Sequence, residues 1–92
     1  MYVVYVIEHD STHQIYIGRT SNLEQRLRSH NSNANKATRR HDGVWVLVYA
    51  EAYRSKKDAV MRESRLKQHG SSKHELLKRI GNCLLEAKSE AG

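Results

Sequence analysis

The sequence of 92 residues contains a single cysteine and no proline. One cysteine excludes an intramolecular disulfide and any zinc module that is built on several cysteines. No apolar run approaches the roughly 20 residues of a membrane-spanning helix. The apolar run 2–7 is too short for a signal sequence and lacks a basic lead. We therefore expect one soluble, intracellular domain, because so short a chain has too little apolar material for a second core.

The charge balance is strongly basic. The chain has 16 Lys and Arg against 10 Asp and Glu, which gives a formal net charge of +6. A surplus of this size on a small domain favours a polyanionic partner, because each cation placed on a phosphate releases a counterion. Nucleic acid is the first candidate partner and an anionic membrane surface the second. The alternative is a basic domain whose charges serve only solubility.

Three stretches of aromatic and β-branched residues predict strands. Residues 2–7 and 14–19 flank a polar turn and predict an antiparallel hairpin. Residues 44–49 form the most apolar run, which is typical of a central strand covered on both faces. With the helices described next, the order is β-β-α-β-α-α. This order indicates an α+β fold with a small three-stranded antiparallel sheet flanked by three or more helices.

Capping residues predict three helices. Ser21, with Glu24 three residues later, forms a capping box for a helix over residues 22–29. Ser55 caps a second helix that ends near residue 69, with Gly70 as a left-handed stop. Ser72 opens a third helix, which holds residues 76–80 and has a possible extension to residue 85. Between the first helix and the third strand we expect a loop over residues 31–35 and a helical turn over 36–40. The domain spans residues 1–88, and residues 89–92 form a frayed tail.

Two basic side chains fall on the apolar stripe of the first predicted helix. Arg26 follows Leu23 by three residues, and His30 follows Leu27 by three, so all four share one face. Arg26 at the edge of that stripe, with its charge reaching water, is the structural interpretation. An inward-facing pair in a polar site is the functional interpretation.

The second predicted helix has an acidic residue in the corresponding place. Its inward stripe consists of Ala59, Val60, Leu66 and Gly70, and Glu63 falls among them. A carboxylate there is unfavourable unless it is paired or bound to a cation. A surface pair with Lys67 is the structural alternative. An arginine and a glutamate that face inward from separate helices favour a polar site.

The hairpin adds two phenols. A symmetric loop across residues 9–12 places Tyr5 opposite Tyr16, as a cross-strand packing pair or as part of the site. Ile15 and Ile17 occupy the other face of the second strand and are better core residues. Gly18 follows Tyr16 at a point where a close backbone approach would be useful.

Other catalytic patterns are absent. The sequence has no glycine loop that could cradle nucleotide phosphates, so we expect no nucleotide cofactor. His9 and His13 lie four residues apart across a turn, where helical zinc geometry fails. We expect Cys83 to be a small core residue of the third helix.

Several blocks, taken in order, resemble the GIY-YIG nuclease family. Tyr16, Ile17 and Gly18 match the second motif, whereas the first motif reads Val3-Val4-Tyr5 and keeps only its tyrosine. The segments 16–30, 46–51 and 59–67 follow in the family's order, so the resemblance spans residues 2–80. The sequence is most similar to small standalone proteins related to the N-terminal domain of the bacterial excision-repair nuclease and to intron-homing endonucleases. DNA repair is therefore an expected context.

The resemblance implies metal-dependent hydrolysis of a DNA phosphodiester. Tyr5 matches the general base, Tyr16 orients the water or exchanges roles with Tyr5, and Arg26 clamps the scissile phosphate. His30 assists the nucleophile or the phosphate, and Glu63 is the single acidic metal ligand, which suits Mg²⁺ or Mn²⁺. A tyrosine with a pKa near 10 is a poor base at neutral pH, so we expect Arg26 and the metal to lower the pKa of Tyr5.

Further basic residues are candidate DNA contacts. They are Arg19, Arg28, Lys36, Arg39, Arg40, Arg62, Arg65 and Lys67. We expect a structured or low-specificity DNA substrate, a protein partner for targeting, and a cytoplasmic or nucleoid-associated location. Two alternatives remain open. One is a module of the same fold that binds nucleic acid without cutting it, and the other is a docking domain with a merely solvated basic face.

Overall fold

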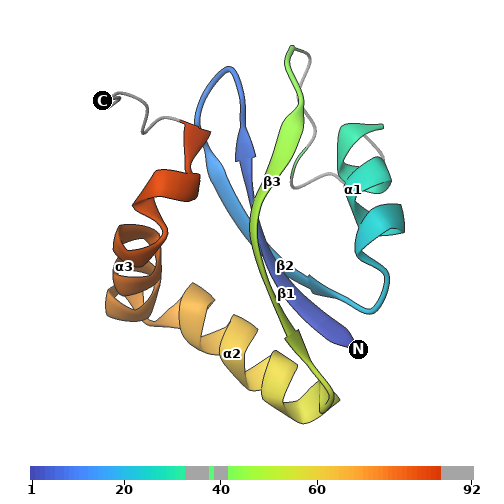
Figure 1. The fold of residues 1–92 in the computed structure, drawn as a ribbon, viewed down its shortest axis with the longest axis vertical. Helices are drawn as coiled ribbons and strands as arrows, with labels where there is room; N and C mark the ends of the chain where they lie inside the picture. The colour runs from blue at the N-terminus through green and yellow to red at the C-terminus, as the bar shows by residue number, and fades with distance from the viewer. Residues whose placement is uncertain (33–37, 39–41, 86–92) are drawn as a thin grey trace.

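The computed structural model describes residues 1–32, 38 and 42–85 (Figure 1). The elements follow the order β1 (Tyr2–His9), β2 (Ile15–Thr20), α1 (Leu23–Asn31), β3 (Trp45–Tyr53), α2 (Lys56–Gln68), α3 (Gly70–Arg79) and a 3-10 turn, η2 (Gly81–Cys83). The predicted α+β class and the β-β-α-β-α-α order are confirmed. Most of the expected segment 31–40, and the tail 89–92, lie outside the described residues. No described helix has the length and apolar character to span a bilayer.

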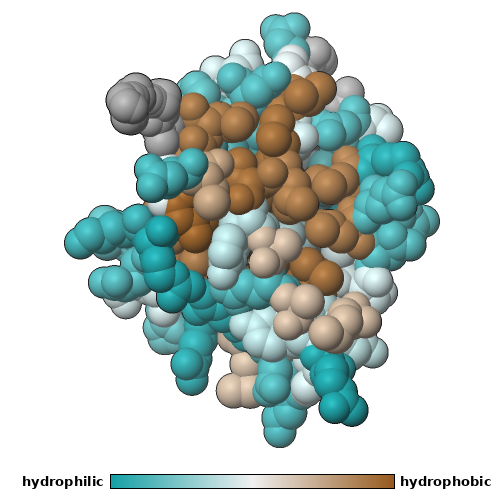
Figure 2. Space-filling model, viewed as in Figure 1, coloured by the Kyte–Doolittle hydropathy of each residue, from teal (hydrophilic) through white to brown (hydrophobic). Residues whose placement is uncertain are grey.

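The central strand is β1, and the prediction that the third strand is central was wrong. The sheet order is β2-β1-β3, with both pairs antiparallel. Every residue of β1 from Val4 to His9 is buried, whereas β3 lies at an edge and, after the buried Trp45, has only half-buried and exposed positions. Val44 and Leu47 expose 48% and 37% of their surface. Figure 2 shows a hydrophobic area over the upper part of β3. An apolar run therefore did not distinguish a covered strand from an edge strand here.

The hairpin register also differs from the prediction. Tyr5 pairs with Gly18, and Tyr16 pairs with Ile7. The turn centres one residue later than a loop across 9–12, since the His9 N–H donates to the Gln14 carbonyl at 2.9 Å. This changes the pairing by two residues, which preserves the face to which each side chain points. Tyr5 and Tyr16 therefore share a face as diagonal neighbours.

Helices cover both faces of the sheet, with α1 on one side and α2 and α3 on the other (Figure 1). The α1 face buries Tyr5, Ile7 and Trp45, against which Leu23 and Leu27 of α1 pack. The opposite face buries the residues Val4, Val6, Ile17, Ala59, Leu66, Leu76 and Ile80. The alternation of β1 side chains thus separates an aromatic layer under α1 from an aliphatic layer under α2 and α3.

Several predicted helix boundaries need correction. The N-cap of α1 is Asn22 and not Ser21, because the Asn22 Oδ1 atom accepts from the Gln25 N–H at 3.1 Å. Ser55 caps α2 as predicted. Gly70 is not a left-handed stop: it is the first residue of α3, and among the described glycines only Gly43 has a positive φ. The extended backbone of His69 ends α2 and begins α3, so Ser72 lies inside the helix and does not open it.

Two predicted core assignments were also wrong. Val60 is 38% exposed, since only Ala59 and Leu66 of α2 are fully buried. The third helix ends at Arg79 and η2 follows, which leaves Cys83 exposed. Beyond η2 the chain returns to the sheet, where the Leu85 N–H donates to the buried Glu8 carboxylate at 2.7 Å.

Alanine substitutions at Gly43 and Gly70 should have opposite effects on stability. Gly43 has φ +81°, and a Cβ atom there would lie 2.7 Å from His9 Cε1, whereas a Cβ at Gly70 meets nothing within 4 Å. Gly43→Ala should lower the free energy of unfolding by about 1–3 kcal/mol. Gly70→Ala should raise it by about 0.4–1 kcal/mol, because helical backbone suits alanine. Urea unfolding measures both, and equal effects of the two substitutions would contradict the assigned conformations.

Candidate active site

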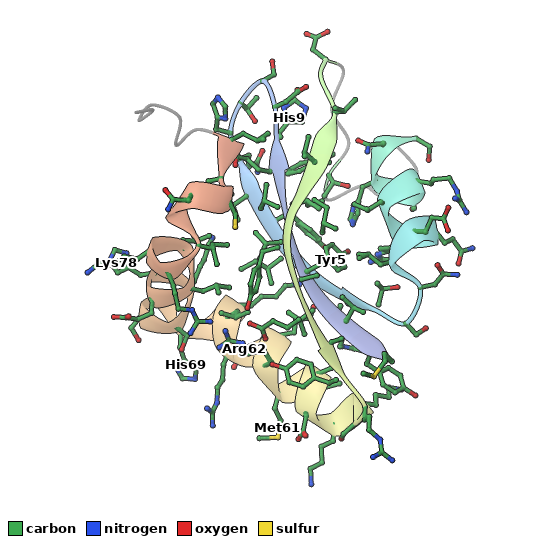
Figure 3. All side chains as sticks on the ribbon, viewed as in Figure 1. Tyr5, His9, Met61, Arg62, His69 and Lys78 are labelled. Carbon is green, nitrogen blue, oxygen red and sulfur yellow. The ribbon has the colours of Figure 1, made fainter. Side chains whose placement is uncertain are left out.

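The site begins with the hydroxyl of Tyr5, on the α1 face of the central strand. Its oxygen accepts from Arg26 Nε at 3.3 Å and lies 2.7 Å from His30 Nε2. Both partners come from consecutive turns of α1, so the predicted inward pair, Arg26 and His30, does face the sheet. Figure 3 shows the Tyr5 side chain on the α1 side of the sheet.

Burial dominates the electrostatics of Tyr5. The residue is 0% exposed, and burial raises the pKa of its phenol while Arg26 acts in the opposite direction with a smaller effect. Arg26 does lower the pKa of Tyr5, as expected, but the larger effect of burial means that the pKa is raised overall. Tyr5 is therefore a neutral phenol at neutral pH, and it needs a proton acceptor before it can serve as a base.

His30 is suited to be that acceptor. Its ring is 0% exposed, and burial, followed by the charge of Arg26, lowers the pKa of the imidazole. A neutral imidazole carries one lone pair, which can face the Tyr5 hydroxyl if the other nitrogen is protonated.

Thr38 controls the far side of the His30 ring. Its Oγ1 atom lies 2.6 Å from His30 Nδ1, and its carbonyl accepts from Trp45 Nε1 at 2.7 Å. The threonine is fully buried. Sequence reasoning missed this residue, because nothing in its spacing from His30 signals a contact between the two side chains. A hydroxyl accepting from Nδ1–H would leave Nε2 free to accept from Tyr5.

Gly18 makes room for the tyrosine pair, as the sequence suggested. A Cβ atom on Gly18 would collide with the Tyr5 hydroxyl and would lie 3.1 Å from a ring carbon of Tyr16. The missing side chain thus allows the Tyr5 ring to lie across the edge strand β2. Any larger residue at this position must displace the hydroxyl from Arg26 and His30.

Tyr16 forms the half-buried part of the aromatic layer. Its ring packs edge-on against His30, with centroids 5.1 Å apart, and against Trp45 at 6.5 Å. The Lys67 ammonium lies 5.4 Å from the centre of the Tyr16 ring. Tyr16 therefore links the buried Tyr5–His30 pair to the charged residues of α2.

Glu63 of α2 is held by two cations. Its Oε1 atom accepts from Arg19 Nε at 3.2 Å, and its Oε2 atom forms an ion pair with Lys67 Nζ at 3.1 Å. The predicted Glu63–Lys67 surface pair thus exists, and Arg19 of β2 completes it. The carboxylate is close enough to Tyr5 to contribute to the raised pKa of its phenol. Glu63 therefore belongs to the same electrostatic cluster as the α1 residues, although it comes from the other layer.

The remaining predicted DNA contacts are spread over the molecule. Arg28 is exposed and pairs with Glu24 on α1 at 3.2 Å, and Arg65 is exposed on α2. Lys36, Arg39 and Arg40 lie outside the described residues.

Arg62 has an internal partner on the α2 face (Figure 3). Its Nε and Nη2 atoms each donate to Glu51 at 2.9 Å, and the hydroxyls of Tyr49 and Tyr53 donate to the same carboxylate. Burial and Glu51 raise the pKa of Tyr53 to about 12. This network ties β3 to α2 and gives Arg62 a structural role.

Glu63 is the candidate metal ligand at this site. Within the described ranges, no group of three or more His, Cys, Asp or Glu residues could hold an ion. A single, 19% exposed carboxylate such as Glu63 fits Mg²⁺ or Mn²⁺, which keep most of their ligands as water. It does not fit zinc, which takes three or four protein ligands. The cluster thus combines a phosphate-binding cation, groups for proton transfer and one hard oxygen ligand, the parts of a phosphodiester hydrolase.

Comparison with known proteins gives the same class. Residues 1–80 match the family model described as the GIY-YIG catalytic domain, so the chain belongs to the GIY-YIG domain family, a family of nucleases. Over 54 residues it is 37% identical to the UPF0213 protein CPE1444 of Clostridium perfringens (strain 13 / Type A). The aligned region covers 59% of this chain and 58% of that protein. The matched region thus spans little more than half the length of that relative.

A solved structure extends the likeness to the whole chain. The solution NMR structure of the UPF0213 protein BH0048 from Bacillus halodurans superposes with a TM-score of 0.56 at 26% identity. The match covers 100% of this chain and 98% of the other. The fold predicted from the sequence is therefore that of a standalone branch of the family.

The lowered pKa of His30 predicts an acid-sensitive fold. Because the unfolded chain binds this proton more readily, His30 contributes stability above its unfolded pKa of about 6.5, and the contribution is lost as the pH falls toward the folded value. Urea unfolding of wild type at several pH values between about 7.5 and 5.5 should show this loss, and His30→Gln should show a smaller one. An equally steep loss in the variant would contradict the buried, neutral histidine.

Proposed function

We propose that the protein is a divalent-metal-dependent endonuclease that hydrolyses a phosphodiester bond of DNA. The observation that carries the proposal is the Tyr5 hydroxyl, held between Arg26 and His30 with Glu63 in electrostatic range. Phosphodiester hydrolysis needs a cation at the phosphate, a proton acceptor for water and stabilisation of the leaving oxygen. Membership of a nuclease family supports the same reaction.

Arg26 binds the scissile phosphate in this proposal. Its Nε atom holds the Tyr5 hydroxyl, which leaves the terminal nitrogens of the fork for two phosphate oxygens. A phosphate bound there lies beside Tyr5. Tyr5 is buried in the free protein. Arg26 must therefore turn toward the phosphate before an attacking water can reach the Tyr5 hydroxyl.

Tyr5 passes a proton from water to His30. As the water oxygen bonds to phosphorus, its proton moves to the Tyr5 oxygen and the phenolic proton moves to His30 Nε2, 2.7 Å away. The bridging P–O bond breaks, and the leaving oxygen takes a proton from solvent. The raised pKa of Tyr5 favours this relay over a standing phenolate. Tyr16, half-buried beside it, orients the water.

Glu63 is the residue that would hold the divalent ion. A bound Mg²⁺ or Mn²⁺ supplies charge stabilisation at the phosphate and leaving oxygens. Arg19, Arg28, Lys36, Arg39, Arg40, Arg65 and Lys67 remain candidate contacts for the flanking backbone, and the internal pairing of Arg62 argues against it as such a contact. Such contacts track the backbone without reading bases, so we propose structured or low-specificity DNA as the substrate, targeting by a partner protein, and a location with the cell's DNA.

Two substitutions test the reaction. Arg26→Gln should lower the cleavage rate by about 10²–10³-fold, because it removes a charged donor at the phosphate. Glu63→Gln should reduce the metal-dependent rate to background, because a neutral amide is a poor ligand for a hard cation. The assay is a panel of supercoiled plasmid, linear duplex, flap and four-way junction DNA with Mg²⁺, Mn²⁺ or EDTA.

Lys78→Gln is the matched control, since Lys78 is exposed on the outer side of α3 (Figure 3). It should cut like wild type, and circular dichroism should show all variants folded. If the wild type binds these DNAs but leaves every one intact with either metal, the protein is a non-catalytic binding module of the same fold.

Substitutions of Thr38 test whether its hydroxyl orients His30 for catalysis. Thr38→Val removes the hydroxyl at nearly constant shape, so His30 loses the partner that orients its lone pair, and kcat should fall by about 10–100-fold. Thr38→Ser keeps the hydroxyl and should restore most of the rate. If valine and serine variants cut equally well, Thr38 has no role in orienting His30.

A further inference from the structure

Both oxygens of the Glu63 carboxylate are occupied by cations from the chain itself. Arg19 Nε contacts Oε1 at 3.2 Å and Lys67 Nζ contacts Oε2 at 3.1 Å. The ion pairs found among residues 1–32 and 42–85 give these two cations no other carboxylate. One negative charge thus faces two positive ones, and Arg26 adds a further positive charge at Tyr5.

This balance makes Glu63 a poor cation site in the free protein. An approaching divalent ion meets a local surplus of positive charge, and it must displace two ion pairs to reach the carboxylate oxygens. The local surplus fits an anion better than a metal. The ion pairs of Glu63 in the free protein therefore oppose metal binding.

The two cations are free to move to a DNA backbone. The side chains of Lys67 and Arg19 are 45% and 32% exposed, against 19% for Glu63. Lys67 also borders a hollow of about 170 Å³ between β2, α2 and α3, lined by Ile15, Tyr16, Ile17, Leu66, Lys67 and Lys73. Among these lining residues two are lysines and none is acidic, so the hollow suits a phosphate group.

We propose that Arg19 and Lys67 are exchangeable counter-ions of Glu63, which DNA phosphates draw away so that the metal site forms only on the substrate. Lys73 is a further phosphate contact at the hollow beside Lys67. This inference rests on the proposed endonuclease function and concerns the order in which the same site fills. DNA and metal then bind cooperatively, and each tightens the other by the same factor.

The proposal predicts an unusual effect of removing the acid. In the absence of metal, Glu63 repels the DNA backbone and holds two cations that would otherwise contact phosphate. Glu63→Gln should therefore bind DNA at least about tenfold more tightly than wild type in EDTA, since one repulsive charge is lost and two cations are released. Glu75→Gln is the matched control, because it removes the same charge from an exposed position of α3 and should change affinity less than about threefold.

Fluorescence anisotropy with a phosphorothioate duplex measures these affinities, since that backbone keeps its charge, and a gel verifies that it stays intact. At fixed ionic strength, Mn²⁺ should tighten binding by wild type at least about threefold and should weaken binding by Glu63→Gln, where the ion only competes for phosphates. Lys73→Gln should weaken binding in both conditions, and Lys78→Gln should not. If Glu63→Gln binds no more tightly than wild type in EDTA, or if Mn²⁺ weakens both proteins equally, the proposal is wrong.

Electron paramagnetic resonance of Mn²⁺ provides a test without DNA. Lys67→Gln should raise the affinity of the free protein for Mn²⁺ at least about threefold, because one competing cation is gone. Unchanged or weaker binding would count against the proposal. If the protein cleaves DNA but metal and DNA do not bind cooperatively, only this inference is wrong. If metal and DNA bind cooperatively but no DNA is cleaved, only the proposed function is wrong. If the wild type binds no DNA at low salt, both are wrong.

Discussion

The position of one phenol organises the molecule. Tyr5 lies on the central strand, under α1, and its ring crosses β2 at a residue without a side chain. Its hydroxyl then meets Arg26 and His30, which α1 presents on consecutive turns. Because a buried hydroxyl requires partners, this arrangement links the register of the hairpin, the rotation of α1 and the choice of glycine at position 18.

Burial gives this cluster its chemical character. Burial raises the pKa of Tyr5 and lowers the pKa of His30. Both groups are therefore neutral in the free protein, and a hydrogen bond connects them. A neutral pair can be fully buried at little electrostatic cost, whereas a phenolate and an imidazolium could not. The charges of the site are kept at its edge, on Arg26, Glu63, Arg19 and Lys67, where a phosphate backbone could reach them.

Two comparable polar clusters that involve α2 have different consequences. On the α2 face, Glu51 accepts four hydrogen bonds from Arg62 and two tyrosines, so its carboxylate is fully occupied and ties β3 to the helix. At the β2 edge, Glu63 is paired with Arg19 and Lys67, whose side chains are 32% and 45% exposed. Both clusters contain an acid, arginine and tyrosine, yet the fixed geometry of one suits structure and the exchangeable partners of the other suit ligand binding.

The sequence by itself determined the class of fold, the element order and the identity of the residues that meet at the site. Those depend on local patterns: alternation in the hairpin, apolar spacing on α1, and a carboxylate placed among the inward residues of α2. The tertiary structure alone decided that β1 and not β3 is central, that Tyr5 faces Gly18, and that Thr38 supports His30. It also decided the direction in which the pKa of Tyr5 moves and that Arg19 is a second cation at Glu63. These features depend on burial and on contacts between residues far apart in the chain, and neither quantity is contained in the spacing of residues along a single segment.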